Sequence, residues 1–213
     1  CMQFGCFIGC LSGAIYGGHA GRAEGAAVLE TAYHLVGLSI YQASFQQSFP
    51  FHLHFTSNSG REMLWLVSVK HQAVARNSRI LTTSNGFLNA GSGTKMVLYE
   101  AAAHGLASTV SGGHLWETAV AHNKYRNYAT PLEARMACEV GHAVAEQGMT
   151  RAAANEIALK LLAKYEDQIP SAPKGKPFQE CYDPRTARPQ TWYLKMYEEV
   201  KEEVAGMGVD FPY

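Results

Sequence analysis

The sequence predicts an α/β fold built around a parallel sheet. Strand-like segments alternate with helix-like segments over the first two-thirds of the 213 residues. These strand-then-helix units repeat about every 35 to 40 residues, and no hairpin turn separates neighbouring strands. Such units place consecutive strands parallel, with a helix crossing between them. The pattern allows a closed barrel and an open doubly wound sheet equally.

The first unit consists of a strand, a glycine-rich turn and a helix. Residues 3–10 are typical of a strand, and the turn spans residues 17–21. A helix is expected from about Arg22, because apolar residues then recur at helical spacing.

The next units follow the same order. Residues 40–45 indicate the second strand, and residues 46–58 a long polar and aromatic loop. A helix is expected over 59–77, because Ser59 and Glu62 have the spacing of a capping box. The remaining segments of this region are a third strand at 80–83, a loop at 84–93, a helix at 94–106 and a short fourth strand at 107–111.

The C-terminal part is expected to be helical from Trp116 onward. Thr130 followed by Pro131 and Glu133 indicates one helix start, and Thr150 caps another helix that ends near Asp167. Residues 169–189 carry five of the eight prolines and are expected to form an extended arm. The last helix is predicted over 191–205.

Composition excludes several classes of protein. Eighteen basic residues balance eighteen acidic ones, so no net charge attracts nucleic acid. No apolar run reaches the roughly 18 residues that span a bilayer, so no membrane partner is expected. Five cysteines, an odd number, do not indicate a disulfide framework, and a reducing, cytoplasmic location is expected. Because Cys1 leads directly into a strand-like run, a truncated chain or gene fragment is also expected.

Four loops are expected at one edge of the sheet, where parallel α/β folds carry their reactive groups. They span residues 17–24, 46–58, 82–93 and 111–114. These loops hold His19, His52, His54 and His114. A functional site at this edge is therefore predicted.

Two local patterns in these loops have more than one interpretation. His52 and His54 project to one side of an extended segment and can chelate zinc or iron, but they also fit an ordinary aromatic loop. The glycine-rich turn can cradle a phosphate or simply join a strand to a helix. Glu24 is either a catalytic carboxylate or an acid that favours the helix dipole.

Residues 171–183 read Ser-Ala-Pro-Lys-Gly-Lys-Pro-Phe-Gln-Glu-Cys-Tyr-Asp. This segment closely resembles the C-terminal arm of the monomethylamine methyltransferases. Residues 132–136, the turn at 17–21 and the pair Arg61 and Glu62 also resemble motifs of that family. The resemblance covers essentially the whole chain, and its register is without gaps from about Leu11 to Gly105.

The resemblance implies an α/β fold that is the C-terminal half of a (β/α)₈ TIM barrel. Residues 1–115 would form the second half of the barrel, and residues 116–213 the C-terminal helices and the proline-rich arm. It also implies methyl transfer from a methylated amine to the Co(I) corrinoid of a partner protein, as in methanogenesis, with no cofactor bound directly. The family's pyrrolysine would lie in the half of the barrel that this chain does not contain. A homo-oligomer is expected.

Three positions depart from the family pattern. A glutamate, a glutamine and a tyrosine of the family fall on Leu11, Asn85 and Phe87. These changes remove a carboxylate and a hydroxyl that would protonate and hold a pyrrolysine adduct. An aromatic site with Phe87, Phe55 and Tyr41 would instead suit a quaternary amine.

The leading hypothesis is therefore a corrinoid-dependent methyltransferase. Its catalytic candidates are Glu24, Asn85 and Phe87, and its substrate-binding candidates are Leu11, His19, His52 and His54. Two alternatives stay open: a metal-dependent hydrolase barrel that uses His52 and His54, and a non-catalytic fragment.

Overall fold

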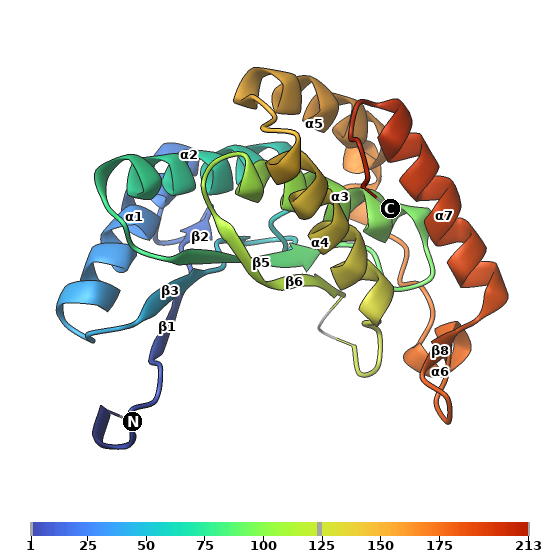
Figure 1. The fold of residues 1–213 in the computed structure, drawn as a ribbon, viewed down its shortest axis with the longest axis horizontal. Coiled ribbons are helices and arrows are strands. Elements are labelled where there is room, and N and C mark those ends of the chain that lie inside the picture. Colours follow the sequence, from blue (N-terminus) through green and yellow to red (C-terminus); the bar gives the residue numbers. More distant parts are fainter. Residues whose placement is uncertain (1, 123–124, 213) are drawn as a thin grey trace.

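The computed structural model describes residues 2–122 and 125–212, with the backbone alone for residues 2 and 115–120. Four strands form one parallel sheet in the order β1-β3-β5-β6 (Figure 1). They span Gly9–Ser12, Phe45–Ser48, Thr82–Leu88 and His114–Ala121. The predicted parallel α/β sheet is confirmed. Within the described residues the sheet is open, so the half-barrel stays a prediction.

Three helices connect the strands of the sheet. They are α1, Ala23–Ser39, α2, Arg61–Asn77, and α3, Lys95–Thr109. Side chains from all three meet one face of the sheet: Ser48 Oγ donates to Glu30 of α1, Thr82 Oγ1 bonds His71 of α2, and Ser84 Oγ bonds His104 of α3. The crossover helices therefore all cover the same face of the sheet. The opposite face carries none of these three helices and is called the open face.

The rest of the chain packs around this layer. A short parallel pair, β2, Ile15–Tyr16, and β4, Phe51–His52, forms a separate two-stranded sheet. The C-terminal part contains α4, Pro131–Glu146, α5, Arg151–Tyr165, α6, Phe178–Cys181, and α7, Thr191–Gly206. Between them lie a 3-10 segment, Glu166–Ser171, and the antiparallel pair β7, Tyr182–Asp183, and β8, Arg188–Pro189; another 3-10 turn, Met2–Phe4, opens the described chain.

Threonine N-caps correctly predicted two helix starts, at Thr130 and Thr150, and Thr94 caps a third predicted helix. Thr94 and Thr150 accept hydrogen bonds from the third residue beyond them, at 3.3 and 3.2 Å. Thr130 donates both its amide and its hydroxyl to the carboxylate of Glu133 at 3.0 and 2.6 Å. These bonds are local, because both partners lie within one turn of helix, and local signals are visible in a sequence.

Several expected elements were wrong in position. The strand expected at 3–10 begins only at Gly9, and the one expected at 40–45 begins at Phe45. The strand expected at 107–111 is instead the end of α3, which runs to Thr109. Trp116, expected to open a helical region, lies in β6. Cys1, which suggested a truncated chain, lies outside the described residues.

The helix predicted from Ser59 starts for a different reason. Its N-cap is Gly60, which supplies no side-chain hydrogen bond. The Ser59 hydroxyl donates instead to Glu100 Oε1 of α3 at 2.6 Å. The hydroxyl that a capping box would use therefore forms a tertiary hydrogen bond instead.

Buried polar groups fill the space between the sheet and its helices. Lys70 of α2 is fully buried, and burial lowers the pKa of its ammonium to about 7. Its Nζ lies 3.0 Å from His71 Nε2, and His71 Nδ1 lies 2.9 Å from Thr82 Oγ1. Burial raises the pKa of Glu30, on the neighbouring helix α1. This face of the sheet is thus held to its helices by hydrogen bonds as well as by apolar packing.

The boundary proposed after residue 115 falls inside β6, which pairs with β5 through Leu88 and Ala121. The larger apolar core also includes buried residues from both sides of that boundary. The division into two parts therefore stays a prediction. In the described part of the chain, every helix is too short or too polar to cross a membrane.

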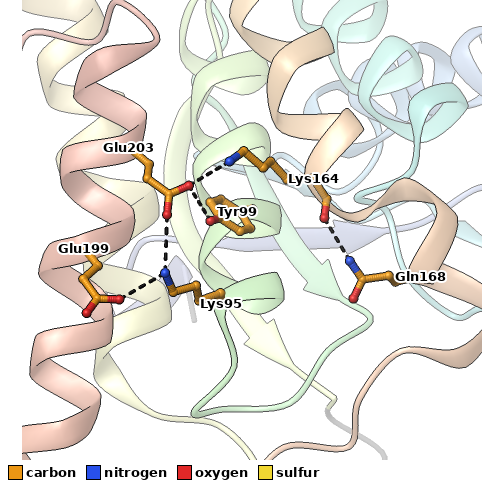
Figure 2. A network of polar contacts seen from close by, with 6 residues as sticks. All are labelled: Lys95, Tyr99, Lys164, Gln168, Glu199 and Glu203. Atoms are coloured by element: carbon orange, nitrogen blue, oxygen red, sulfur yellow. Dashed lines mark hydrogen bonds and ion pairs between the residues drawn. The ribbon is translucent and has the colours of Figure 1, made fainter.

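A polar network ties α7 to α3 and α5 (Figure 2). Glu203 of α7 accepts hydrogen bonds from Tyr99 Oη at 2.7 Å and Lys164 Nζ at 2.9 Å, and Lys95 Nζ lies 3.4 Å away. The hydrogen bonds from Lys164 and Tyr99 lower the pKa of Glu203 to about 2. One carboxylate therefore joins three helices that are far apart in sequence.

We expect Glu203→Gln to lower the free energy of unfolding by about 1 kcal/mol at neutral pH, a modest value because the network is partly exposed. The ionised carboxylate stabilises the fold above pH 4.5, and this contribution is lost as the pH falls toward about 2. Denaturant unfolding at several pH values measures it. Glu202→Gln, at an exposed neighbour, is the control. Equal stabilities of the two variants at neutral pH would contradict the prediction.

Candidate functional site

The open face of the sheet brings together the three positions that depart from the family pattern. Leu11 on β1 is paired in register with Gln47 of β3. Gln47 Nε2 donates to Asn85 Oδ1 of β5 at 2.5 Å. The Phe87 ring stacks on the Phe49 ring, with the two ring centroids 5.2 Å apart. Asn85 is buried, Phe87 is half-buried, and the side chain of Leu11 is exposed. Residues separated by more than 70 positions in the sequence thus share one polar and aromatic surface.

Asn85 and Phe87 lie within β5, not in the loop where the sequence placed them. The strand runs on to Leu88, and its pairing with β6 shifts register between Ser84 and Asn85 and again between Asn85 and Phe87. Such irregularities redirect side chains and are common beside functional sites.

Asn58, which the sequence analysis did not single out, fixes this part of β5. Its Nδ2 donates to the Asn85 carbonyl at 2.6 Å, and its Oδ1 accepts from the Phe87 amide at 2.8 Å. Its own amide also donates to the Phe87 carbonyl at 2.9 Å. Because Asn58 is fully buried, these bonds are shielded from water and hold both candidate residues in place.

Glu100 performs a similar role for the loop after β5. Its carboxylate accepts from Ser59 Oγ at 2.6 Å, from the Asn89 amide and Nδ2 at 2.9 and 2.8 Å, and from the Ala90 amide at 2.9 Å. Burial raises the pKa of this fully enclosed carboxyl. The Tyr165 hydroxyl donates to the Ser59 carbonyl at 2.6 Å and connects α5 to the same point.

His52 is packed among aromatic rings at the edge of the sheet. Its ring centroid lies 5.0 Å from that of Tyr16 and 4.6 Å from that of Phe55. Its Nδ1 accepts the amides of His54 and Phe55, and burial followed by the charge of His54 lowers its pKa. Among the described residues, no group of three or more His, Cys, Asp or Glu could hold a metal ion.

The other candidates lie apart from the open face. His19 is exposed and lies 3.5 Å from Tyr33 Oη. Glu24 is exposed in the first turn of α1, as the helix-dipole interpretation requires. Tyr41, proposed for an aromatic site, is exposed between α1 and β3. It therefore lies before the amino end of β3, at the opposite edge of the sheet from the carboxyl ends of the strands.

The glycine-rich turn is closed by its own backbone. The Gly17 amide donates to the Gly21 carbonyl at 2.7 Å, and the Gly21 amide to the Gly18 carbonyl at 3.1 Å. Gly17 and Gly21 have φ values of 79° and 69°, which favour glycine. The geometry favours a tight strand-to-helix turn over a phosphate cradle, because two of its amides are already paired.

The arm lies against the loop that follows β5. The Gly91 amide donates to the Pro173 carbonyl, and the Lys176 amide donates to the Ser92 carbonyl, both at 2.9 Å. A Cβ on Gly91 would lie 1.7 Å from the Lys174 carbonyl oxygen, so only glycine fits there. The long arm motif is therefore part of the same edge as the end of β5.

The family model described as monomethylamine methyltransferase MtmB matches residues 5–209. This chain belongs to the monomethylamine methyltransferase family. It is 33% identical over 198 residues to monomethylamine methyltransferase MtmB2 of Methanosarcina acetivorans, covering 92% of this chain and 43% of that protein. It is 31% identical over the same length, with the same coverage, to MtmB of Methanosarcina mazei.

The fold is similar to solved structures of the same family. The crystal structure of the Methanosarcina barkeri monomethylamine methyltransferase superposes with a TM-score of 0.91 at 32% identity, covering 96% of this chain and 45% of that one. A crystal structure of a hydroxylamine MtmB complex gives the same values. The chain thus spans less than half the length of the relatives that it matches.

We expect Asn58→Leu to lower the free energy of unfolding by about 2 to 4 kcal/mol, because two buried backbone groups lose their partners. Asn77→Leu, which removes an exposed bond from the end of α2, should cost less than about 1 kcal/mol. Denaturant unfolding of both variants measures the difference. If the free energy of unfolding fell no more for Asn58→Leu than for Asn77→Leu, the hydrogen bonds of Asn58 would not stabilise β5.

Proposed function

We propose that the chain forms part of an enzyme that transfers a methyl group from a methylated amine to the Co(I) corrinoid of a partner protein. Membership of the monomethylamine methyltransferase family supports the reaction class. The observation that carries the site assignment is the convergence of Leu11, Asn85 and Phe87 on one open face of the sheet.

We propose that this open face lines the interior of a (β/α)₈ barrel, of which residues 1–115 supply the second half. The strands follow one another in chain order, and all three crossover helices lie on one side. That arrangement is the one found in barrels, whereas doubly wound sheets carry helices on both faces. The exposed side chain of Leu11 is consistent with a surface that another segment covers.

The residues on this face do not fit a pyrrolysine adduct. Leu11 offers no carboxyl group, Phe87 offers no hydroxyl, and the Asn85 amide oxygen already accepts from Gln47. No proton donor for an amine adduct is therefore present at these three positions. A step through pyrrolysine is not part of the proposal.

A quaternary amine suits these residues better than monomethylamine does. Its nitrogen carries a permanent charge, so the C–N bond can break with the electron pair returning to nitrogen and no proton transfer. The methyl group goes to the corrinoid cobalt, and the neutral amine departs. Phe87, stacked on Phe49, presents an aromatic surface that attracts a methylated ammonium.

The site would also include His19 in the turn after β2, Glu24 in the first turn of α1, and His52 and His54 at and after the end of β4. The enzyme would be a homo-oligomer in the cytoplasm, and its partner would be a corrinoid protein. It would bind neither nucleic acid nor a membrane.

We expect the chain, assembled with the segment that completes the barrel, to demethylate tetramethylammonium and not monomethylamine. Phe87→Ala should lower the rate at least about tenfold by removing one cation–π contact, and Tyr41→Ala should leave it unchanged. The change in Co(I) absorbance of the corrinoid protein measures transfer. Turnover of monomethylamine would contradict the substrate assignment, and inactivity with every methylated amine would favour the non-catalytic fragment.

The hydrolase alternative makes a different prediction. His52 and His54 would have to bind a metal, yet His52 Nδ1 already accepts two backbone amides. We expect protein purified without chelators to contain far less than one zinc or iron per chain, and His52→Gln not to change that content. Elemental analysis measures it. One tightly bound zinc per chain that is lost in His52→Gln would overturn the methyltransferase proposal.

A further inference from the structure

A pocket of about 430 Å³ lies beyond the carboxyl ends of β5 and β6. Its lining includes Asn89, directly after β5, His122, directly after β6, and Lys174 of the arm. Ligands of parallel sheets bind at this edge. Leu11, Asn85 and Phe87 are not among the lining residues, whereas His54, which is also proposed to contribute to the substrate site, does line the pocket.

The polar side chains that line the pocket carry no negative charge. They are His54, Asn89, His122, Tyr125, Ser171 and Lys174. No aspartate or glutamate of the described chain contributes to the lining. The ammonium of Lys174 forms no ion pair with any described residue, so no described carboxylate neutralises its charge.

Aromatic rings set the position of that ammonium. Lys174 Nζ lies 4.5 Å from the centroid of the Tyr125 ring and 4.8 Å from that of Tyr128. Two rings on one ammonium restrict a side chain that is otherwise flexible in water. Lys174 is exposed, and these two ring contacts place its ammonium beside the pocket.

The backbone around Lys174 is equally constrained. Pro173 on one side and Lys176 on the other are hydrogen-bonded to Gly91 and Ser92, respectively. Elsewhere in the lining, both the amide and the side chain of Asn89 are held by Glu100. These parts of the lining are thus held in place by the protein itself, which lowers the entropic cost of binding.

We propose that this pocket binds a small oxyanion, with phosphate as the representative ligand. A phosphate offers several acceptor oxygens to the Lys174 ammonium, the imidazole groups of His54 and His122 and the Ser171 hydroxyl. The absence of carboxylates from the described lining removes the repulsion that would exclude an anion. Free phosphate and a phosphate ester share this chemistry.

The test is a calorimetric titration of the purified chain with inorganic phosphate, repeated with methyl phosphate and with tetramethylammonium chloride at equal ionic strength. We expect saturable binding of phosphate that Lys174→Met weakens at least about tenfold and Lys174→Arg largely retains. Tighter binding of methyl phosphate would identify an ester as the natural ligand, and tighter binding of free phosphate would identify the ion. Both outcomes support the oxyanion site.

Lys176→Met is the matched control. Lys176 is an exposed lysine of the same arm, its Nζ lies 4.6 Å from the centroid of the Trp192 ring, and it does not line the pocket. It should bind phosphate as wild type does. His54→Gln provides a second variant in an exposed lining residue. No saturable phosphate binding by the wild type, equal losses at 174 and 176, or a preference for tetramethylammonium would each overturn the proposal. Because every readout is binding, the result is independent of the proposed methyl transfer.

Discussion

The edge of the sheet depends on one buried carboxylate. Glu100 projects from α3 and accepts four hydrogen bonds, three of them from Asn89 and Ala90 in the loop after β5 and one from Ser59 before α2. Removing these donors from water is costly unless each has a partner, so the loop has few alternative conformations. The arm packs on the next residues of that loop, Gly91 and Ser92. The geometry of the loop after β5, and of the arm that packs on it, therefore depends on Glu100.

The sequence predicted the helices well and the strands poorly, for a physical reason. Helix starts at Thr94, Thr130 and Thr150 depend on bonds within one turn, which a short segment displays. The strands do not show the apolar runs that usually reveal a buried parallel sheet. β3 reads Phe-Gln-Gln-Ser, and β5 begins Thr-Thr-Ser-Asn.

Those polar strand residues are tolerated only because distant helices supply partners. Ser48 depends on Glu30, Thr82 on His71, and Ser84 on His104. None of these pairings is visible in a window of ten residues. The same explanation covers Ser59, whose capping role was predicted from local spacing but whose hydroxyl is used by Glu100, 41 residues away. Local rules fail here where tertiary hydrogen bonds compete for the same atoms.

The candidate site shows the same division. The family register selected Leu11, Asn85 and Phe87 without information on the fold, and the structure brings them to one face. Asn58 and Gln47, which hold that arrangement, could not be recognised, because an asparagine in a polar loop and a glutamine in a short strand carry no local signal. Their importance arises only from partners 27 to 38 residues away.

The arm motif explains why a segment so far from the strands identifies the family. Gly91 leaves no room for a side chain beside the Lys174 carbonyl, and Gly175 adopts a φ of 72° directly against the Gly91 backbone. A motif with glycine at such a contact must be matched by glycine in the loop that it meets, because a Cβ on either side breaks the contact. The arm and the β5 loop therefore constrain each other's sequence. This coupling makes the C-terminal segment a structural part of the sheet edge at which the proposed oxyanion pocket lies.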